Sequence, residues 1–402
     1  MDRRKWKRAG RRRMGAAMAM AAVMVWLPLF PVRGQTGMTE AETVKTEASE
    51  TGAAEGLTPD LTEIDSFLEE QNTGFSFSQL VEELTAGSWQ QVPRILLEQG
   101  GELLFSEINQ NRKELFFLFA LAAVSGIFTN FASVFRSGQI AQTGFYVTCL
   151  VLTATLLSAF AAASSVAQDF LELLLRFMTV LIPAFFLAVA YGGGSISSAG
   201  FYQTTLLAIS GVEWIFLDVL LPFVKIYLIL VLVNEIAGED LLSRMARLVK
   251  KGTGWGMKSL FSVILGLQAI QGLILPYADS VKTGAVKKVA GLIPGVGKGI
   301  DAVAEVMMGS GVLIKNGIGT AAFLCLVLIS LVPLLKLAVI SVMYQLAAAV
   351  LAPVADKRML RCIDAMAAAV GILLKMSAMA MLMFGVSIAL VCSVTNARYF
   401  GG

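Results

Sequence analysis

The chain has 402 residues, of which 56% are hydrophobic and only 15% are charged. Soluble globular domains have roughly 25% charged residues, so this composition excludes a soluble protein and predicts a membrane protein. Histidine is absent, which removes the commonest general base, the commonest metal ligand and every Ser-His or Cys-His nucleophile pair. We therefore expect a protein that is not an enzyme and that has no cofactor, no metal site and no catalytic residues.

The N-terminus combines a basic and an apolar segment. The first thirteen residues have eight Lys or Arg against one Asp, and the run "MGAAMAMAAVMVWLPLFPV" follows them. This order is typical of a secretory signal sequence, which we assign to residues 1–34. The alternative is an uncleaved first membrane helix, and both interpretations place residue 35 outside the cytoplasm.

The next eighty residues are acidic, with fifteen Asp or Glu against three Lys or Arg between Gln35 and Arg112. Residues 35–56 have almost no aliphatic side chains and cannot bury enough apolar area to offset chain entropy, so we expect a disordered acidic linker. Over residues 57–112 the aliphatic residues return at helical spacing. This pattern predicts short amphipathic helices on the outer face of the membrane.

Apolar runs then follow one another, most of them close to the roughly 20 residues that cross about 30 Å of hydrocarbon. We predict an all-α fold with a polytopic transmembrane domain over residues 113–395 and six to eight spans, with eight preferred. The runs are centred on residues 115–135, 142–164, 170–191, 201–218, 220–236, 257–278, 318–345 and 366–392. The count depends on residues 201–236, where Pro222 is the predicted position of a tight hairpin between two spans.

Basic short loops stay in the cytoplasm, and this rule favours the hairpin. The hairpin places three basic segments in the cytoplasm, namely Arg136, the basic amphipathic segment 238–256 and the loop "DKRMLR" at residues 356–361. Eight spans leave both the mature N-terminus and the C-terminus outside. The glycine-broken segment 279–317 then also lies outside although it has several lysines, so we expect it either to re-enter the membrane or to lie along the outer surface.

The string "GLIPGVGKGI" at residues 291–300 has glycines around a lysine, as phosphate-binding loops do. Such a loop needs the pattern G-x-x-x-x-G-K-[ST] after a buried strand. Here Leu292 takes the place of the first glycine, Gly299 takes the place of the Ser or Thr, and the preceding segment is amphipathic and rich in lysine. The string does not predict a nucleotide site.

A helix break explains these glycines better. Pro294, Gly295 and Gly297 interrupt an amphipathic helix, and a second helix follows them. Irregular backbone beside a membrane is tolerated where it packs in protein or lines an aqueous cavity. The segment is therefore either a re-entrant element of a conduit or an outer helical hairpin that serves as a docking surface.

Several ionised side chains fall within or near the apolar runs, where a charge is expensive and usually faces a bundle interior, a cavity or a partner. Arg176 lies about two turns into its run and Lys336 lies deep in another. We hypothesise that Lys336 or Arg176 pairs with Glu213 or Asp218. The alternative is that residues near span ends, such as Lys375, extend to the membrane surface.

Four strings in the second half of the chain resemble the stage III sporulation protein AE family of endospore-forming bacteria, from about residue 60 to residue 395. They are "PFVKIYLILVLVNEIAGED", "WGMKSLFSVILGLQAIQGLILPYADSV", "IPGVGKGIDAVAEVMMGSGVLIKNGIG" and "YQLAAAVLAPVADKRMLRCI". The order of the strings, after a signal sequence and an acidic segment, supports the resemblance.

The resemblance implies a non-enzymatic membrane subunit of the channel that links mother cell and forespore, needed for late forespore gene expression. It implies a multi-pass location in the mother-cell membrane around the forespore. It also implies partners among the other stage III A-series proteins, including an ATPase and ring-forming subunits, and the forespore stage II Q protein. Apart from these proteins and membrane lipid we expect no partner, and no nucleic acid.

The family offers no established catalytic residues, so the candidate structural or conduit residues come from the patterns above. They are Pro294, Gly295, Gly297, Lys315, Asn316, Lys336, Arg176 and Glu213. Two other classes of function are considered. An autonomous permease-like secondary transporter would use paired intramembrane charges, and an intramembrane enzyme would need a carboxylate pair or a Ser-Lys dyad. Ser341 and Lys336, five residues apart, are poorly placed for such a dyad.

Overall fold

The computed structural model describes residues 61–70, 76–85, 116–117, 120, 138–191, 195–237, 242–290, 297–353 and 355–396. All of them belong to one compact unit, Leu57–Gly402. The predicted signal sequence and acidic linker lie outside the described residues. Within these ranges every regular element is helical and no strand is present, so the predicted all-α class is confirmed.

Long helices dominate the described part of the chain. In chain order the elements are α2 (Thr62–Glu70), α3 (Phe77–Thr85), α5 (Gly138–Tyr191), α6 (Ser195–Val212), the π-helix η3 (Glu213–Leu220), α7 (Leu221–Ala237), α8 (Ser243–Ala290), α9 (Gly297–Leu351) and α10 (Lys357–Asn396). The predicted basic loop 238–256 is mostly helical, because α8 begins at Ser243.

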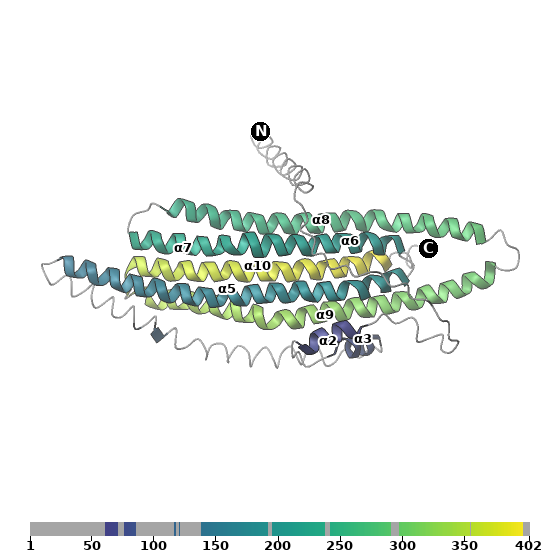
Figure 1. Cartoon of the computed structure of the whole chain (residues 1–402), viewed down its shortest axis with the longest axis horizontal. Helices are drawn as coiled ribbons and strands as arrows, with labels where there is room; N and C mark the ends of the chain where they lie inside the picture. The colour runs from purple at the N-terminus through teal and green to yellow at the C-terminus, as the bar shows by residue number, and fades with distance from the viewer. Residues whose placement is uncertain are drawn as a thin grey trace, which may run out of the picture. The chain divides into compact units, whose positions relative to one another are not determined.

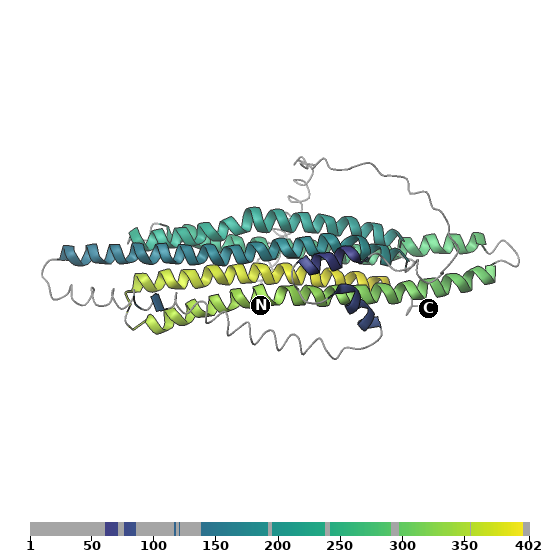
Figure 2. The same ribbon diagram turned by 60° about the horizontal axis from the view of Figure 1, so that its bottom comes forward.

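The central helix is α10, which packs against α5, α6, α7, α8 and α9. Figures 1 and 2 show the long helices side by side, with α10 in yellow between α7 and α5 in Figure 1. Its fully buried positions include the small residues Ala369 and Ala380 and the larger Met376 and Phe384. Small residues let helix backbones approach closely, and one continuous hydrophobic core results.

Two pairs of predicted spans are joined in the structure. Residues 142–164 and 170–191 belong to the single helix α5, which continues through Pro183, and residues 201–236 stay helical from α6 to α7. The described residues contain five helices long and apolar enough to cross a membrane. The predicted count of eight is therefore not confirmed. The span predicted at 115–135 lies outside the described residues apart from three positions.

The hairpin predicted at Pro222 is wrong, because the chain does not turn there. The π-helix η3 ends directly before α7, and the N–H of Leu221 donates to the carbonyl of Phe216, five residues back. In a regular α-helix a proline lacks the donor for the carbonyl four residues before it, and its ring clashes with that carbonyl. The i to i+5 bonding of a π-helix widens the turn before Pro222, so the chain continues as α7.

The short helices α2 and α3 pack against α5 and α9, respectively. Their amphipathic pattern places Ile64, Leu68 and Phe77 on the buried side. The ring centroid of Phe67 lies 6.2 Å from that of Phe177 on α5. The helices predicted for this region are thus present, and their apolar side covers part of the long helices.

A single carboxylate joins α2 to the start of α3. Oδ1 of Asp65 accepts hydrogen bonds from the N–H of Phe77 at 2.6 Å, from the N–H of Ser78 at 3.2 Å and from the hydroxyl of Ser76 at 2.8 Å. The first N–H groups of a helix have no partner within the helix, and a negative charge at this end is favourable. Asp65 therefore acts as an N-terminal cap supplied by the neighbouring helix.

Acid is expected to loosen the α2 and α3 pair. Partial burial raises the pKa of Asp65, but the hydrogen bonds from Ser78, Ser76 and Phe77 outweigh it and hold the pKa below its usual value of 3.8. A carboxylate with a lowered folded-state pKa stabilises the fold above its unfolded pKa, and this contribution is lost as pH falls through the folded pKa. Hydrogen exchange of the α3 amides, corrected for intrinsic pH dependence, should therefore accelerate below pH about 4.

The variant Asp65→Asn should show this fast exchange at neutral pH, while Glu63→Gln, at an exposed position of α2, should behave like the unmodified protein. Equal protection of α3 in both variants would show that Asp65 does not hold the pair.

A glycine permits the close packing of α9 on α10 and α5. A Cβ atom at Gly319 would overlap Sγ of Cys392 and lie 3.2 Å from Cε2 of Phe185. By contrast, a Cβ atom at Gly266 of α8 would have no neighbour within 4 Å. These two glycines form a matched pair, one required by packing and one not.

Gly319→Ala is expected to destabilise the bundle by about 1–3 kcal/mol, because overpacking forces side chains or backbone to move. Gly266→Ala is expected to be neutral or to stabilise it by up to about 1 kcal/mol, because alanine favours a helix over glycine. Thermal unfolding of the two purified variants in detergent measures the difference. Equal midpoints would mean that α9 does not approach α10 as closely as described.

Candidate functional site

One end of the bundle, which we call the basic end, contains the α7 to α8 and α9 to α10 junctions. Residues 244–251 of α8 and 357–361 of α10 are rich in Lys and Arg. The junctions lie together, because Nη2 of Arg361 is 2.6 Å from Oε2 of Glu235 near the end of α7. The two basic loops that the sequence assigned to one side of the membrane are therefore at the same end of the bundle.

The polar residues that organise the basic end were missed by the sequence analysis. The Glu235 side chain is 8% exposed and that of Arg361 is 54% exposed, so the arginine neutralises a buried carboxylate that would be costly without a partner. Oδ1 of the buried Asn234 accepts a hydrogen bond from the N–H of Leu242 at 2.8 Å, just before α8. The available signal was the Asn-Glu pair at the end of an apolar run.

Away from the basic end, three long helices each contain 20 consecutive residues without Asp, Glu, Lys or Arg: 259–278 of α8, 316–335 of α9 and 376–395 of α10. A charged residue bounds each run on the side of the basic end, and α5 and η3 each have an exposed charged residue as well. We call this set the charged boundary; it consists of Arg176, Glu213, Lys258, Lys336 and Lys375.

Packing contacts relate four members of the charged boundary in two pairs. On the antiparallel helices α9 and α10, a Cβ atom at Gly371 would lie 3.5 Å from Oγ of Ser341, which places Lys336 level with Lys375. A Cβ atom at Gly256 of α8 would lie 3.0 Å from Cδ2 of Leu220, which places Lys258 level with Asp218 and about one turn from Glu213.

The remaining member, Arg176, lies 15 residues before the end of α5, and Glu213 lies 18 residues after the start of α6. Because α5 and α6 follow each other through residues 191–195, these counts give both residues a similar depth, about 25 Å from that end. Phe185 of α5 and Cys392 of α10 both lie at Gly319 of α9, so Arg176 lies about 12 Å farther from the basic end than Lys375. The charged boundary is therefore level at its three lysines, and Arg176 lies deeper in the bundle.

The charges that the sequence predicted within the spans lie mainly on the outside of the bundle. Arg176, Glu213 and Asp218 are exposed and Lys336 is half-buried. Because a π-helix bonds residues five apart, Glu213 and Asp218 stand on successive turns of η3 and share its exposed face. The hypothesis that they pair with Arg176 or Lys336 stays a prediction.

The predicted residues of the outer segment are only partly described. Pro294 and Gly295 lie outside the described residues, and Gly297 is the first residue of α9. Lys315 is 1% exposed, and its Nζ donates a hydrogen bond to the backbone oxygen of Cys392 at 3.4 Å. Asn316 is half-buried beside it.

Lys315 thus lies between α9 and α10 and interacts with a carbonyl one turn before the end of α10. A cation is favourable near the C-terminus of a helix, where carbonyl groups lack partners. This position indicates a structural role in joining the two helices.

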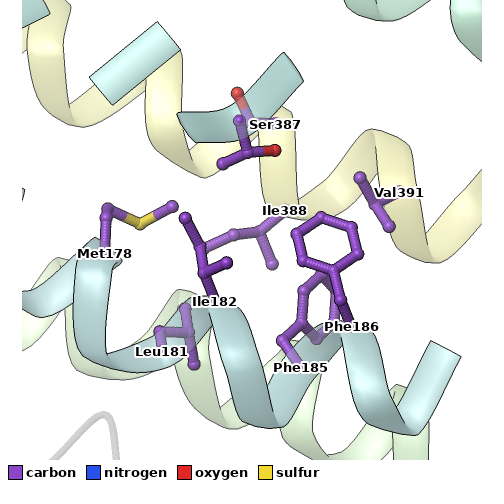
Figure 3. A pocket seen from close by; sticks show the side chains of 9 residues that line it. Met178, Leu181, Ile182, Phe185, Phe186, Ser387, Ile388 and Val391 are labelled. Carbon is purple, nitrogen blue, oxygen red and sulfur yellow. The ribbon is translucent and has the colours of Figure 1, made fainter. Parts of the chain in front are cut away.

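The contact between α5 and α10 at this level is tightly packed. A cavity between α5 and α10 has a volume of only about 10 Å³, about the minimum for one water molecule. Figure 3 shows apolar side chains of α5, among them Met178, Ile182 and Phe186, directed towards Ile388 and Val391 of α10. Among the described residues, no group of three or more Cys, Asp or Glu side chains is placed to hold a metal ion.

Comparison with known proteins identifies the family. The family described as stage III sporulation protein AE matches residues 75–395, which include all the long helices. The chain belongs to this family. A relative from Bacillus subtilis (strain 168), named stage III sporulation protein AE, is 23% identical over 294 residues, which cover 73% of this chain and 74% of the relative. No solved structure matches the chain.

Membership of the stage III sporulation protein AE family assigns the chain a role in sporulation. Together with the five long apolar helices, it makes the chain a membrane protein. The charged boundary and the basic end are the two polar features that this family member presents within its described helices.

Removing the buried carboxylate should weaken the basic end. Glu235→Ala is expected to lower stability by about 1.5–3 kcal/mol, because a hydrogen bond between charged groups is lost and a buried space is left. Asp364→Ala, at an exposed position on α10, is the control and should change stability by less than about 0.5 kcal/mol. Thermal unfolding in detergent compares the two, and equal effects would exclude a structural role for the ion pair.

Proposed function

We propose that the protein is a non-enzymatic membrane subunit of a channel complex between the mother cell and the forespore, needed for late forespore gene expression. It would lie in the mother-cell membrane around the forespore. Its partners would be the other stage III A-series proteins, including an ATPase and ring-forming subunits, and the forespore stage II Q protein. Membership of a sporulation family supports this proposal.

The observation that most favours a subunit over a self-contained transporter is that polar groups within the candidate spans lie on the outside of the bundle. Arg176 and Glu213 are exposed. The pair α2 and α3 covers α5 at Phe177, and Glu63 and Glu69 on α2 are exposed. A charged face is expensive in hydrocarbon, so these surfaces require water or another protein beside them.

The tight packing between α5 and α10 leads to the same conclusion. Secondary transporters bind their substrate between repeats near the middle of the membrane, in a site lined by broken helices. Here the cavity between α5 and α10 has room for one water molecule at most and is lined mainly by apolar side chains. A polar pathway would therefore run along the outside of this bundle, and other chains would complete its wall.

We also propose six spans, namely residues 115–135 and the five long helical segments. Joining two pairs of predicted spans leaves the sidedness of the basic end unchanged, because the number of crossings before it falls by an even number. The basic end then lies in the cytoplasm, as the positive-inside rule requires. The α8 to α9 junction and the C-terminus lie outside.

Deletion of the gene in its spore-forming host tests the proposal directly. We expect normal vegetative growth and engulfment, followed by loss of late forespore reporter expression. Expression of the gene in the mother cell alone should restore the reporter. Normal spores together with a defect in growth or solute uptake would instead support an autonomous transporter.

The variant Lys336→Met separates a subunit from a transporter that uses this charge for coupling. A subunit should keep its assembly with partner proteins and at least half of the wild-type spore yield, because the half-buried Lys336 lies at the charged boundary and not in an interior cavity. Co-purification from sporulating cells and spore counts measure both. Complete loss of function with intact assembly would contradict the subunit proposal.

A further inference from the structure

A hollow with two lysines lies beside the charged boundary. It has a volume of about 340 Å³, within the range of small-molecule sites, and is lined by α8, α9 and α10. Its lining includes two cationic side chains, Lys250 of α8 and Lys375 of α10, and the amide group of Gln345 of α9. We call it the lysine hollow. None of the described residues that line it is acidic.

Small residues create this space. The hollow is lined on α10 by the small residues Ala367, Ala368 and Gly371. A Cβ atom at Gly371 would meet only Oγ of Ser341, at 3.5 Å. Larger side chains on these turns of α10 would fill the gap between α8 and α9, so the sequence of α10 itself keeps the hollow open.

The two ammonium groups determine which ligand fits. Two cations with no carboxylate among the lining residues repel each other and favour an anion between them. Nζ of Lys250 also lies 5.4 Å from the centre of the Tyr227 ring on α7. This contact holds one cation at the hollow by a cation–π interaction. A phosphate group has the charge and the acceptor oxygens to bind both lysines.

The level of the hollow indicates where this phosphate comes from. The candidate spans contain 32 to 45 residues, roughly 48–68 Å of helix, whereas the hydrocarbon core is only about 30 Å thick. The bilayer therefore cannot cover their whole length. The charge-free runs 259–278, 316–335 and 376–395 begin or end near the hollow and have the length of one hydrocarbon core.

A second hollow supports this position of the interface. On the other side of the bundle, Lys225 of α7 lines a hollow of about 330 Å³ together with Ser164 and Gln168 of α5. Lys225 is two residues from Tyr227, which contacts Lys250. Lysines on opposite sides of the bundle thus occupy one level, as expected where lipid headgroups meet water.

We propose that the lysine hollow binds the phosphate of an anionic phospholipid, with Lys250 and Lys375 as its two cationic ligands. The acyl chains lie along the charge-free side of α10, where Leu382, seven residues beyond Lys375, is 57% exposed. Basic pockets between membrane helices bind anionic headgroups in this way. The proposal does not depend on the channel function.

Thermal unfolding of the purified full chain in detergent, titrated with single lipids, tests the proposal. Dioleoyl phosphatidylglycerol and cardiolipin should raise the unfolding midpoint, and dioleoyl phosphatidylcholine should not. The double variant Lys250→Gln, Lys375→Gln should bind phosphatidylglycerol at least tenfold more weakly. Lys251→Gln, Lys258→Gln removes two exposed lysines of α8 that do not line the hollow and should retain the wild-type affinity.

Ala368→Leu provides a second variant. It keeps both lysines and places a larger side chain in the hollow, so it should also weaken lipid binding at least tenfold. Equal loss in the two lysine pairs would show a general effect of surface charge and overturn the site. Equal stabilisation by glycerol 1-phosphate would show a soluble anion site instead of a lipid site. Equal stabilisation by phosphatidylcholine would show that the lysines do not select the ligand.

Discussion

The cost of placing a charge in hydrocarbon organises the described helices. By insertion scales, one charged residue at the centre of a membrane helix costs about 2.5–3.5 kcal/mol. This is similar to what burying one large apolar side chain contributes. Long helices that share one bilayer therefore tolerate charges most easily where they meet water. The common level of Lys336 and Lys375 at the charged boundary requires the antiparallel register of α9 and α10, and the deeper, exposed Arg176 requires water or another protein beside it.

The cost of a charge in hydrocarbon also explains why the two ends of the bundle have different side-chain contacts. The closed contact between α5 and α10 and the approach of α9 at Gly319 belong to the charge-free side. The ion pair between Arg361 and Glu235 belongs to the basic end. Apolar packing runs through the whole bundle, and the basic end adds paired polar groups to it. The two lysine-lined hollows lie at the transition between the charge-free side and the basic end.

The sequence was sufficient to predict the helical class, the apolar runs and the amphipathic α2 and α3. It was not sufficient to distinguish a polar loop from a polar stripe on a continuous helix. Asp169 lay between two predicted spans, and Glu172 and Arg176 lay within the second of them, yet their spacing of three and four residues places all three on one face of α5. At Pro222 no local pattern could reveal the π-helix, because the widened turn depends on hydrogen bonds of the preceding backbone.

Tertiary contacts were also beyond the sequence. The pairing of Glu235 with Arg361 joins two helices that are far apart in the chain. The sequence singled out Lys315 as a charged residue, but its partner is the backbone carbonyl of Cys392, which has no sequence signature.

The π-helix η3 also sets the rotational phase between α6 and α7. Each residue turns an α-helix by about 100°, so one residue more or less in η3 would turn all of α7 by that angle about its axis. Tyr227 would leave Lys250, Lys225 would leave its hollow on α5, and Glu235 would turn away from Arg361. The eight residues Glu213–Leu220 therefore act as a spacer of fixed length, in which substitutions are tolerated more readily than an insertion or a deletion.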